Sequence, residues 1–387
     1  MIELIIEKRL FWLRKGFFIV KVLYMTNYPS PYRVDFFSEL GKYCNLSVVF
    51  EQTMEEQLHR NPDWFCHCFE NFEAIYLKNT RWKQKYYFEI LNYIKSDYDV
   101  IIVGYYASLI AQIAIAYMYI HQIPFYIETD GGIPKTGHGF KEGLKKRVIS
   151  SASYYFSPSE LSDCYLEFYG AKKKNIIRYP FSSLHRNEIL SDPVDKKVKD
   201  KLKKKLGIIH KNMVMTVGQF IYRKANEVLI EASGDIDSDT EICIIGGKPT
   251  AEYLKLVSEK FLTNITFIDF KKKEELRTYY MAADVFVMPT REDIWGLVIN
   301  EAMAYGLPVV STDKCIAALE LVKNGRNGYI IPPNQPKEIA QKVNLILQND
   351  KLRMQMAAHS IKTIQDYTIE NMAIVHKNHF IKMKTIN

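Results

Sequence analysis

Short apolar runs alternate with longer amphipathic segments along most of this chain. In the first half, the runs expected to form strands are residues 18–25, 46–50, 74–77, 100–103, 124–128 and 154–156. In the second half they are residues 213–217, 242–245, 265–268, 285–288, 308–311 and 328–331. Because strands that alternate with helices form parallel sheets covered on both faces, the pattern predicts an α/β protein. Two such halves predict two Rossmann-like, doubly wound domains facing a cleft.

A lysine-rich segment marks the junction between the two halves. Asp192 followed by Pro193 is typical of a helix start, with Asp as the cap and Pro at the first position. Apolar residues then recur every four positions at Val194, Val198, Leu202 and Leu206. The opposite face, which we expect to be solvated, carries Lys196, Lys197, Lys199, Lys201, Lys203, Lys204 and Lys205. We therefore predict domains over residues 1–185 and 190–365, with a helix near 366–387 that packs back on the first.

The composition fits a large protein of two domains without a membrane span. Its 387 residues and 48% apolar content are sufficient for two cores. The longest apolar run, residues 107–120, is shorter than the ~20 residues that a bilayer requires. Six cysteines are scattered without a disulfide framework, which favours a reducing cytoplasm. Cys66, His67 and Cys68 have no second ligand pair nearby, so we interpret them as packing residues and not as a zinc site.

Attachment to an anionic membrane is an alternative, because two segments are basic. They are the lysine face and the start of the chain. The formal net charge is +8, and each basic residue near anionic lipid contributes about 1 kcal/mol of attraction. Residues 1–18 form either an interfacial helix or, as we favour, an extension of the first strand. The expected location is the cytoplasm, with peripheral attachment to the inner face of the membrane as the alternative. Nucleic acid is not an expected partner, because no recognition module accompanies the charge.

Residues 283–310 combine a strand, a loop with two carboxylates and a helix that begins at a glycine. Free backbone N–H groups and the positive end of the helix dipole at 296–298 favour an anion such as phosphate. Asp293 before the helix and Glu301 within it are suited to accept hydrogen bonds from hydroxyl groups. Hydroxyl, diphosphate and hydroxyl in this order outline a nucleotide sugar. The simpler interpretation is an ordinary strand-helix unit with a solvated acidic loop.

These residues resemble the signature of glycosyltransferase family 4, whose members are retaining enzymes of the GT-B fold that use nucleotide-sugar donors. The family pattern is Glu, seven residues, Glu, then Ala-Met-Ala-x-Gly-x-Pro-Val-Val. Counted back from Glu301, the first position is Asp293, with Glu292 beside it, and either carboxylate can fill the role. The resemblance implies that Glu301 binds the ribose and that the first carboxylate binds the transferred sugar. It implies a phosphate site formed by Gly296, Leu297 and Val298.

A second motif, G-Q-F-I-Y-R-K-A, follows the first strand of the second half. A departing nucleoside diphosphate needs positive charge nearby, and this motif supplies it. In the family the pattern is Gly-Arg, a few residues, then Lys-Gly, and Gly218 and Lys224 match it. Gln219 replaces the arginine and Ala225 the second glycine, so Arg223 is the candidate to supply the missing charge. On its own, an Arg-Lys pair before a helix is more often a solvated cap.

The first domain is expected to hold the acceptor. After its first strand, the run Pro-x-Pro-Tyr-Arg resembles a subset of the family and places Asn27, Tyr32 and Arg33 near the cleft. The alternative is that Arg33 only caps the loop.

The segment F-Y-I-E-T-D-G-G ends a strand at Glu128 and brings the next residues to the carboxyl edge of the sheet, where open α/β folds bind ligands. It resembles a branch of the family found in bacterial capsule and exopolysaccharide clusters, and the resemblance covers nearly the whole chain. Asp130 is expected to contact the reacting sugar or the acceptor hydroxyl. Gly131, Gly132 and His138 are also placed on the acceptor side, although the glycines can be turn formers only and His138 an ordinary loop residue.

The resemblance implies a retaining transfer from a UDP-, GDP- or dTDP-sugar to a hydroxyl of a growing, lipid-linked glycan in cell-surface polysaccharide synthesis. The catalytic set would be Asp130, Lys224, Asp293 and Glu301, with no cofactor and no metal. A leaving diphosphate oxygen can take the proton of the incoming hydroxyl, so no protein nucleophile is required.

Two other classes compete with this interpretation. A nucleotide-sugar epimerase shares the fold, and a non-catalytic partner subunit of a glycosyltransferase complex would keep the fold without releasing nucleotide. An NAD dehydrogenase is disfavoured, because no G-x-G-x-x-G follows the first strand. Asp235, Asp237 and Asp239 lie in an expected turn, so a metal-dependent transferase site is not expected there.

Overall fold

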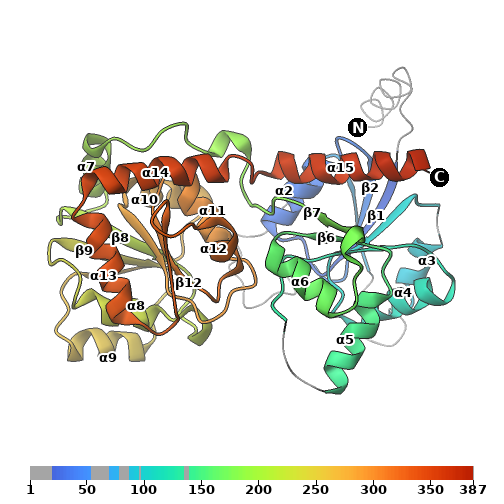
Figure 1. Cartoon of the computed structure of the whole chain (residues 1–387), viewed down its shortest axis with the longest axis horizontal. Helices are drawn as coiled ribbons and strands as arrows, with labels where there is room; N and C mark the ends of the chain where they lie inside the picture. Colours follow the sequence, from blue (N-terminus) through green and yellow to red (C-terminus); the bar gives the residue numbers. More distant parts are fainter. Residues whose placement is uncertain (1–19, 54–68, 78–86, 96, 135–138, 387) are drawn as a thin grey trace. The chain divides into compact units, whose positions relative to one another are not determined.

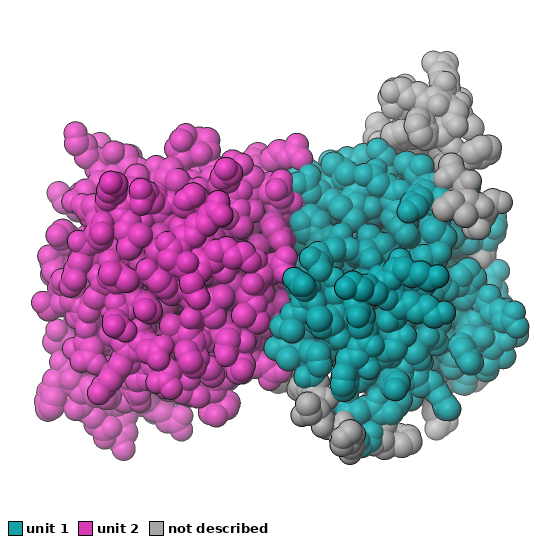
Figure 2. Space-filling view, viewed as in Figure 1, with its two compact units in different colours: residues 1–181, 369–387 teal, residues 182–368 magenta. Residues whose placement is uncertain are grey.

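The structure is a computed structural model. It describes residues 20–53, 69–77, 87–95, 97–134 and 139–386. The chain forms two compact units, which Figure 2 colours separately. Unit 1 comprises Met1–Phe181 and Ile369–Asn387, and unit 2 comprises Ser182–Thr368.

Unit 1 is built on a seven-stranded sheet whose paired strands are all parallel. Its strands are β1 (Lys21–Thr26), β2 (Asn45–Phe50), β3 (Glu73–Tyr76), β4 (Val100–Val103), β5 (Tyr126–Glu128), β6 (Tyr154–Ser157) and β7 (Ile176–Arg178). The order across the sheet is β3-β2-β1-β4-β5-β6-β7. From the neighbours β1 and β4 the chain winds away in opposite directions, and such a switch point is where doubly wound sheets bind ligands.

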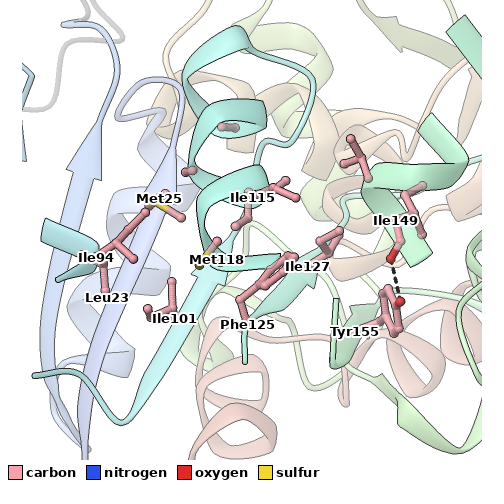
Figure 3. Close-up of a cluster of buried hydrophobic side chains, with 14 of the residues drawn as sticks. Leu23, Met25, Ile94, Ile101, Ile115, Met118, Phe125, Ile127, Ile149 and Tyr155 are labelled. Carbon is pink, nitrogen blue, oxygen red and sulfur yellow. Dashed lines mark hydrogen bonds between the residues drawn. The ribbon is translucent and has the colours of Figure 1, made fainter. Parts of the chain in front are cut away.

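Helices cover both faces of this sheet. They are α2 (Pro31–Leu40), α3 (Ile90–Ile94), α4 (Leu109–Ile120), α5 (Phe140–Ser150), α6 (Glu160–Phe168) and α15 (Ile369–Ile386). On one face, residues of α3, α4, α5 and α6 share a core with Leu23, Ile101 and Ile127 of the strands, and Figure 3 draws part of this core. The Tyr155 hydroxyl donates to the backbone oxygen of Ile149 at 2.7 Å, which ties β6 to α5.

The opposite face is covered by α2 and α15, which lie side by side although they are far apart in the chain (Figure 1). Successive residues of a strand point to opposite faces of the sheet. Tyr24 of β1 therefore packs on Phe37 of α2, and Phe156 of β6 stacks on His376 of α15. Aromatic rings form much of this second layer.

Unit 2 repeats the plan with six parallel strands. They are β8 (Asn212–Val217), β9 (Thr240–Ile245), β10 (Ile265–Ile268), β11 (Val285–Met288), β12 (Val309–Thr312) and β13 (Gly328–Ile331). The order is β10-β9-β8-β11-β12-β13, so β8 and β11 are the neighbours at its switch point.

The helices of unit 2 are also distributed over both faces of its sheet. They are α7 (Lys196–Lys205), α8 (Asn226–Ser233), α9 (Ala251–Glu259), α10 (Lys273–Ala282), α11 (Leu297–Ala304), α12 (Ile316–Leu321), α13 (Pro336–Leu347) and α14 (Asp350–Ile364). Residues of α8 and α13 share a core with Val214, Ile244 and Val287. On the other face, Tyr280 of α10 contacts Phe286 of β11.

The prediction of an α/β protein with two Rossmann-like parallel sheets is confirmed. The strands predicted at 100–103, 265–268, 285–288 and 328–331 have the observed bounds, and the others differ at their ends. One strand was missed. The run Ile176–Arg178 is short and ends on a charged residue, so periodicity gives little signal for β7.

Two predictions about the junction helix α7, its cap and its buried face, are wrong in part. Its cap is Asp195 and not Asp192, because the Asp195 carboxylate accepts the backbone N–H of Lys197 at 2.8 Å. Val198, predicted on the apolar face, is 41% exposed, whereas Lys203, predicted to be solvated, is 5% exposed. The inward side of the helix therefore includes Leu202 and Leu206 of the predicted apolar face, but Lys199 and Lys203 lie on it in place of Val198.

The buried lysines of α7 share one carboxylate partner, Asp284. Nζ of Lys203 lies 2.6 Å from Oδ2 of Asp284, and Nζ of Lys199 lies 3.7 Å from Oδ1. Burial lowers the pKa of Lys199 to about 8, although the charge of Asp284 acts to raise it. The same Asp284 carboxylate accepts the N–H of Met213 at 3.0 Å. The two ion pairs and this hydrogen bond hold α7 against the amino ends of β8 and β11.

Several sequence predictions lie outside the described residues: the segment 1–18, Cys66, His67, Cys68 and His138. Within the described part of the chain, none of the helices is both long enough and apolar enough to cross a membrane. The same residues contain no group of three or more His, Cys, Asp or Glu side chains arranged to hold a metal ion.

Candidate functional site

The loops that follow β8 and β11 are joined at the switch point of unit 2. The backbone N–H of Arg291 and the hydroxyl of Thr290 both donate to the backbone oxygen of Arg223, at 2.8 and 2.7 Å. These bonds bring the two sequence motifs of the second half together. Lys224 and Asp293, one from each motif, are 69 positions apart in the chain.

Asp293 is the centre of this arrangement. Its Oδ2 atom lies 2.5 Å from Nζ of Lys224 and 3.3 Å from a guanidinium nitrogen of Arg223. The backbone N–H of Asp293 donates to the oxygen of Lys314 at 2.9 Å, which fixes the loop to the segment after β12. Glu292, the other candidate for the first carboxylate, is exposed. A carboxylate and two cations therefore converge at the end of β11.

Gly296 allows the chain to turn from this loop into α11. Its φ is +102°, a conformation that L residues with a side chain rarely adopt, and a Cβ atom there would lie 2.7 Å from Sγ of Cys315. Leu297 and Val298 follow in the first turn, where N–H groups have no carbonyl partner inside the helix. The positive end of the helix dipole lies at the same place. This helix start offers hydrogen-bond donors to an anion four residues after Asp293.

Glu301 is half-buried, one turn along α11 from Leu297. The hydroxyl of Tyr280 donates to its Oε2 at 2.9 Å, and the hydroxyl of Ser183 donates to its Oε1 at 3.3 Å. Burial raises the pKa of Glu301 above its ordinary value, although the hydrogen bond from Tyr280 and the charge of Lys273 act to lower it. Neither Tyr280 nor Ser183 was predicted, because a hydroxyl in a helix or a loop carries no pattern of its own.

The Gly218 motif forms a tight turn before α8. Tyr222–Lys224 is one turn of 3₁₀ helix, and Ala225 after it has φ +54° and ψ +37°, in the left-handed region. This is the position where the resembled family has glycine, which adopts that region without strain. Gly218 lies close to the Lys224 side chain, since a Cβ atom on it would be 3.4 Å from Cδ of Lys224. Gln219 is exposed.

In unit 1, Arg33 is buried and joins two carboxylates. One guanidinium nitrogen donates to Oε1 of Glu128 at 2.8 Å and to the hydroxyl oxygen of Tyr24 at 2.7 Å. The other guanidinium nitrogen donates to Oδ1 of Asp130. The Tyr32 hydroxyl donates to Oδ2 of Asp130 at 3.1 Å. Arg33 therefore holds the carboxylates at the end of β5 instead of capping its own loop.

The two carboxylates differ in access to solvent. The side chain of Asp130 is 33% exposed, whereas that of Glu128 is fully buried. Burial raises the pKa of Asp130, although the charge of Arg33 acts to lower it. Burial also acts to raise the pKa of Glu128, but the charges and hydrogen bonds of His376 and Arg33 outweigh it and lower this pKa to about 2. Asp130 is the carboxylate that can meet a ligand, and Glu128 belongs to its support.

The local structure explains why glycine occupies both positions after Asp130. Gly131 has φ +146°, and its N–H donates to the hydroxyl oxygen of Thr129 at 3.1 Å. A Cβ atom on Gly132 would lie 2.6 Å from the ring of Tyr165. Both residues shape the loop that carries Asp130.

His376 was missed by the sequence analysis. Its Nε2 atom lies 3.0 Å from Oε2 of Glu128, 248 positions away in the chain. A lone histidine in the last helix carries no motif, so only the fold reveals this contact.

Two Rossmann-like units, each with a parallel sheet covered by helices on both faces, are the architecture of the GT-B fold. Residues 198–363 match the family described as Glycosyl transferases group 1. The matched residues lie within unit 2 and make up most of it.

The chain is also similar to curated glycosyltransferases. The chain is 29% identical over 176 residues to D-inositol 3-phosphate glycosyltransferase of Corynebacterium diphtheriae, covering 42% of this chain and 41% of the relative. It is 21% identical over 237 residues to N,N'-diacetylbacillosaminyl-diphospho-undecaprenol alpha-1,3-N-acetylgalactosaminyltransferase of Campylobacter jejuni, covering 59% and 62%. The chain spans about half the length of the curated relatives that it matches first.

Solved structures show the same fold over nearly the whole chain. Alr3699/HepE of Anabaena, crystallised in complex with UDP and glucose, has a TM-score of 0.71 at 17% identity. The match covers 95% of this chain and 99% of that protein. At this identity the similarity establishes the GT-B fold alone.

Proposed function

We propose that the protein is a retaining glycosyltransferase that moves a sugar from a nucleotide-sugar donor to a hydroxyl of a growing glycan. The observation that carries the proposal is the contact between Lys224 and Asp293 beside the Gly296 helix start, within a group 1 domain. A cation, a carboxylate and backbone N–H donors are the groups that a sugar diphosphate requires.

In this proposal the diphosphate binds at the start of α11. The N–H groups of Leu297 and Val298 donate to phosphate oxygens, and Lys224 exchanges its carboxylate partner for phosphate. The exchange releases Asp293 to accept hydrogen bonds from the sugar. Arg223 adds a second positive charge at 3.3 Å from the same carboxylate. Both side chains stabilise the negative charge of the leaving diphosphate most strongly when the C1–O bond to the phosphate breaks.

Glu301 is suited to the ribose. A carboxylate has about four acceptor positions, and the hydroxyls of Tyr280 and Ser183 occupy one on each oxygen. The remaining positions can accept the two ribose hydroxyls. Because Leu297 and Glu301 are one turn apart, they share a face of α11, which fits a ribose next to its phosphates.

The acceptor is assigned to unit 1. Asp130 is partly exposed and held by Arg33 and Tyr32, so it can orient an acceptor hydroxyl. In the transfer, the acceptor oxygen forms the new bond to C1, and its proton moves to the leaving diphosphate oxygen. No protein nucleophile and no metal are needed for this step.

The names of two similar proteins support the proposed donor and acceptor classes. The name of the Campylobacter relative specifies a diphospho-undecaprenol-linked acceptor, which supports a lipid-linked glycan here. UDP bound to Alr3699/HepE supports a nucleoside diphosphate donor. Capsule or exopolysaccharide synthesis in the cytoplasm, at the inner face of the membrane, is the setting that these assignments favour.

The test is an assay of the full chain with UDP-, GDP- and dTDP-sugars and a lipid-linked glycan acceptor. We expect one donor to release nucleoside diphosphate in equal amount to the glycosylated product, with the anomeric configuration of the donor retained. Isomerised sugar without release of nucleotide would instead identify an epimerase. Nucleotide binding without turnover of any donor would identify a non-catalytic partner subunit.

A further inference from the structure

His376 of α15 is buried in unit 1, and both of its ring nitrogens face oxygen atoms. Nδ1 lies 2.8 Å from the backbone oxygen of Met372, and Nε2 lies 3.0 Å from Oε2 of Glu128. A carbonyl oxygen only accepts hydrogen bonds, so Nδ1 carries a proton.

Glu128 determines the state of the second nitrogen. Its other oxygen, Oε1, accepts from the guanidinium of Arg33 at 2.8 Å. The guanidinium of Arg33 is always charged, and a carboxyl group that accepts a hydrogen bond from it at this distance is ionised. An ionised carboxylate only accepts, and Nε2 therefore also carries a proton. A ring with protons on both nitrogens is an imidazolium cation.

The surroundings of the ring suit a cation. The ring of Phe156 is stacked on it, with centroids 3.9 Å apart and an angle of 25° between the planes. The face of an aromatic ring attracts positive charge, most strongly where water is excluded. Both His376 and Glu128 have fully buried side chains.

The charges of the four neighbouring side chains Arg33, Glu128, Asp130 and His376 cancel only if His376 is protonated on both nitrogens. Arg33 and His376 then supply two positive charges against the two negative charges of Glu128 and Asp130. Without the imidazolium, the single guanidinium of Arg33 would face two carboxylates in a buried place. Removing one member of such a group is strongly unfavourable, because it leaves an uncompensated charge.

We propose that His376 is a positioning residue for Asp130: as an imidazolium hydrogen-bonded to Glu128 it balances the charge of that carboxylate, which leaves one arm of Arg33 to hold Asp130 in place. The consequence for sugar transfer rests on the function proposed above, whereas the protonation of the ring does not.

Neighbouring titratable groups do not replace this charge. Burial raises the pKa values of Tyr24, Tyr32 and Tyr179 above their ordinary value, so these phenols stay neutral. Burial and the charge of His376 lower the pKa of His379 to about 4, so this second histidine of α15 is neutral near pH 7.

The first test is a ¹⁵N NMR spectrum of full-length protein labelled in its histidine rings, with His376 assigned through its proximity to Phe36 and His379 through its proximity to Tyr126. At neutral pH we expect both ring nitrogens of His376 to be protonated, and those of His379 to show one protonated and one bare nitrogen. A bare ring nitrogen on His376 at neutral pH would overturn the proposal. This measurement needs no enzymatic activity and no folded variant.

The second test compares H376Q with H379Q, a matched control one turn along the same helix. We expect H376Q to lower kcat by about tenfold or more with little change in the KM of the donor, because donor contacts lie in unit 2. The acidic limb of the pH profile of kcat should move to higher pH, since Asp130 loses a balancing charge. H379Q should behave as the unmodified protein.

Failure of either assignment can be recognised separately. If the unmodified protein transfers a sugar and H376Q matches H379Q in kcat and pH profile, the positioning role is wrong while the proposed function stands. If no sugar is transferred but the ring is doubly protonated, the proposed function fails and the charge assignment stands. Should H376Q not fold, E128Q provides the second variant, in which His376 should lose one ring proton at neutral pH; a ring still fully protonated there would contradict the pairing.

Discussion

Nζ of Lys224 and Oδ2 of Asp293 lie 2.5 Å apart. Lys224 belongs to the loop after β8 and Asp293 to the loop after β11, and these two strands flank the switch point of unit 2. The pair holds a cation beside a helix start that offers free N–H groups. A lysine paired in this way can change partner without moving far, because a phosphate oxygen and a carboxylate oxygen make similar charge-assisted bonds.

Lys224→Ala should lower kcat by more than about tenfold, a loss of about 1.4 kcal/mol or more in the stabilisation of the transition state. The reason is that the charge of the leaving diphosphate loses its cation. Steady-state release of nucleoside diphosphate measures the effect. Lys255→Ala, on an exposed lysine of α9, is the matched control and should retain full activity. Equal rates for both variants would remove Lys224 from the site.

Asp293→Ala and Glu292→Ala should differ by about tenfold or more in kcat/KM. Asp293 contacts Lys224 and Arg223 and is fixed through its backbone, whereas Glu292 is exposed. Kinetics with the preferred donor of the unmodified protein would measure the difference. If Glu292→Ala is the more damaging change, the first carboxylate of the motif is Glu292 and the alignment on Asp293 is wrong.

Glu301 should give donor binding a dependence on pH. Its pKa lies above the ordinary value because the loss of solvent around the carboxyl disfavours the charged form, and the ionised form is the one suited to accept hydrogen bonds from both ribose hydroxyls. Donor affinity should therefore fall as pH is lowered through this raised pKa, at a higher pH than for an ordinary glutamate. Calorimetric titration with nucleoside diphosphate measures it.

Glu301→Gln should bind the same nucleotide weakly and with little dependence on pH. Glu252→Gln, on the exposed start of α9, is the control and should follow the unmodified protein. A pH dependence that survives in Glu301→Gln would assign it to another group.

Ala225 is a strained position that can be relieved. The left-handed conformation costs a residue with a Cβ atom about 1–2 kcal/mol, and Ala225 is fully buried in it. Ala225→Gly relieves this strain. Glycine also gives the unfolded chain more conformational freedom, which lowers the free energy of unfolding by about 0.4–1 kcal/mol. Denaturant unfolding should show a neutral to slightly stabilised protein. Ala225→Val should be destabilised, and a valine variant as stable as the glycine variant would contradict the strain.

Asp284→Asn should destabilise unit 2 without acting on the chemistry. Breaking a buried ion pair costs about 3–5 kcal/mol, and Asp284 contacts Lys199 and Lys203 far from the loops of the candidate site. Burial acts to raise the pKa of Asp284, but both lysines outweigh it and lower this pKa. The stabilisation is therefore complete above the pKa of the unfolded chain and is lost as pH falls through the lower folded value. Thermal unfolding at several pH values measures it.

The control for that variant is Glu259→Gln. Glu259 is 61% exposed and pairs with Lys255, which is 73% exposed, and exposed pairs contribute about 0–1 kcal/mol. Its melting temperature should barely change. A similar loss in both variants would mean that burial of the Asp284 pair contributes nothing.

Much of the fold was predictable because it depends on local pattern. Strands β4, β10, β11 and β13 are apolar runs bounded by polar residues, and the alternation with helices fixes the parallel arrangement. The burial of Lys199 and Lys203 on α7 was not predictable. The partner of Lys199 and Lys203 is Asp284, about 80 positions away, and only the folded chain brings it to them.

The candidate site was predictable where residues belong to one motif. The loop around Asp293, the Gly296 turn and the Lys224 turn were each visible as short patterns next to a strand. Their supports were not visible. Tyr280 reaches Glu301 from another helix, and His376 reaches Glu128 from the other end of the chain. Such contacts depend on tertiary structure and leave no trace in local spacing.

The helix α15 returns to unit 1 after the whole of unit 2 has been made. A nascent chain emerging from the ribosome therefore carries a first sheet whose aromatic layer around Phe156 stays bare throughout translation of the second. Domains usually fold in the order of their synthesis, but here the earlier one is finished last. Chaperones are expected to engage that bare layer, and a fragment cut at Phe181 should aggregate when it is expressed alone.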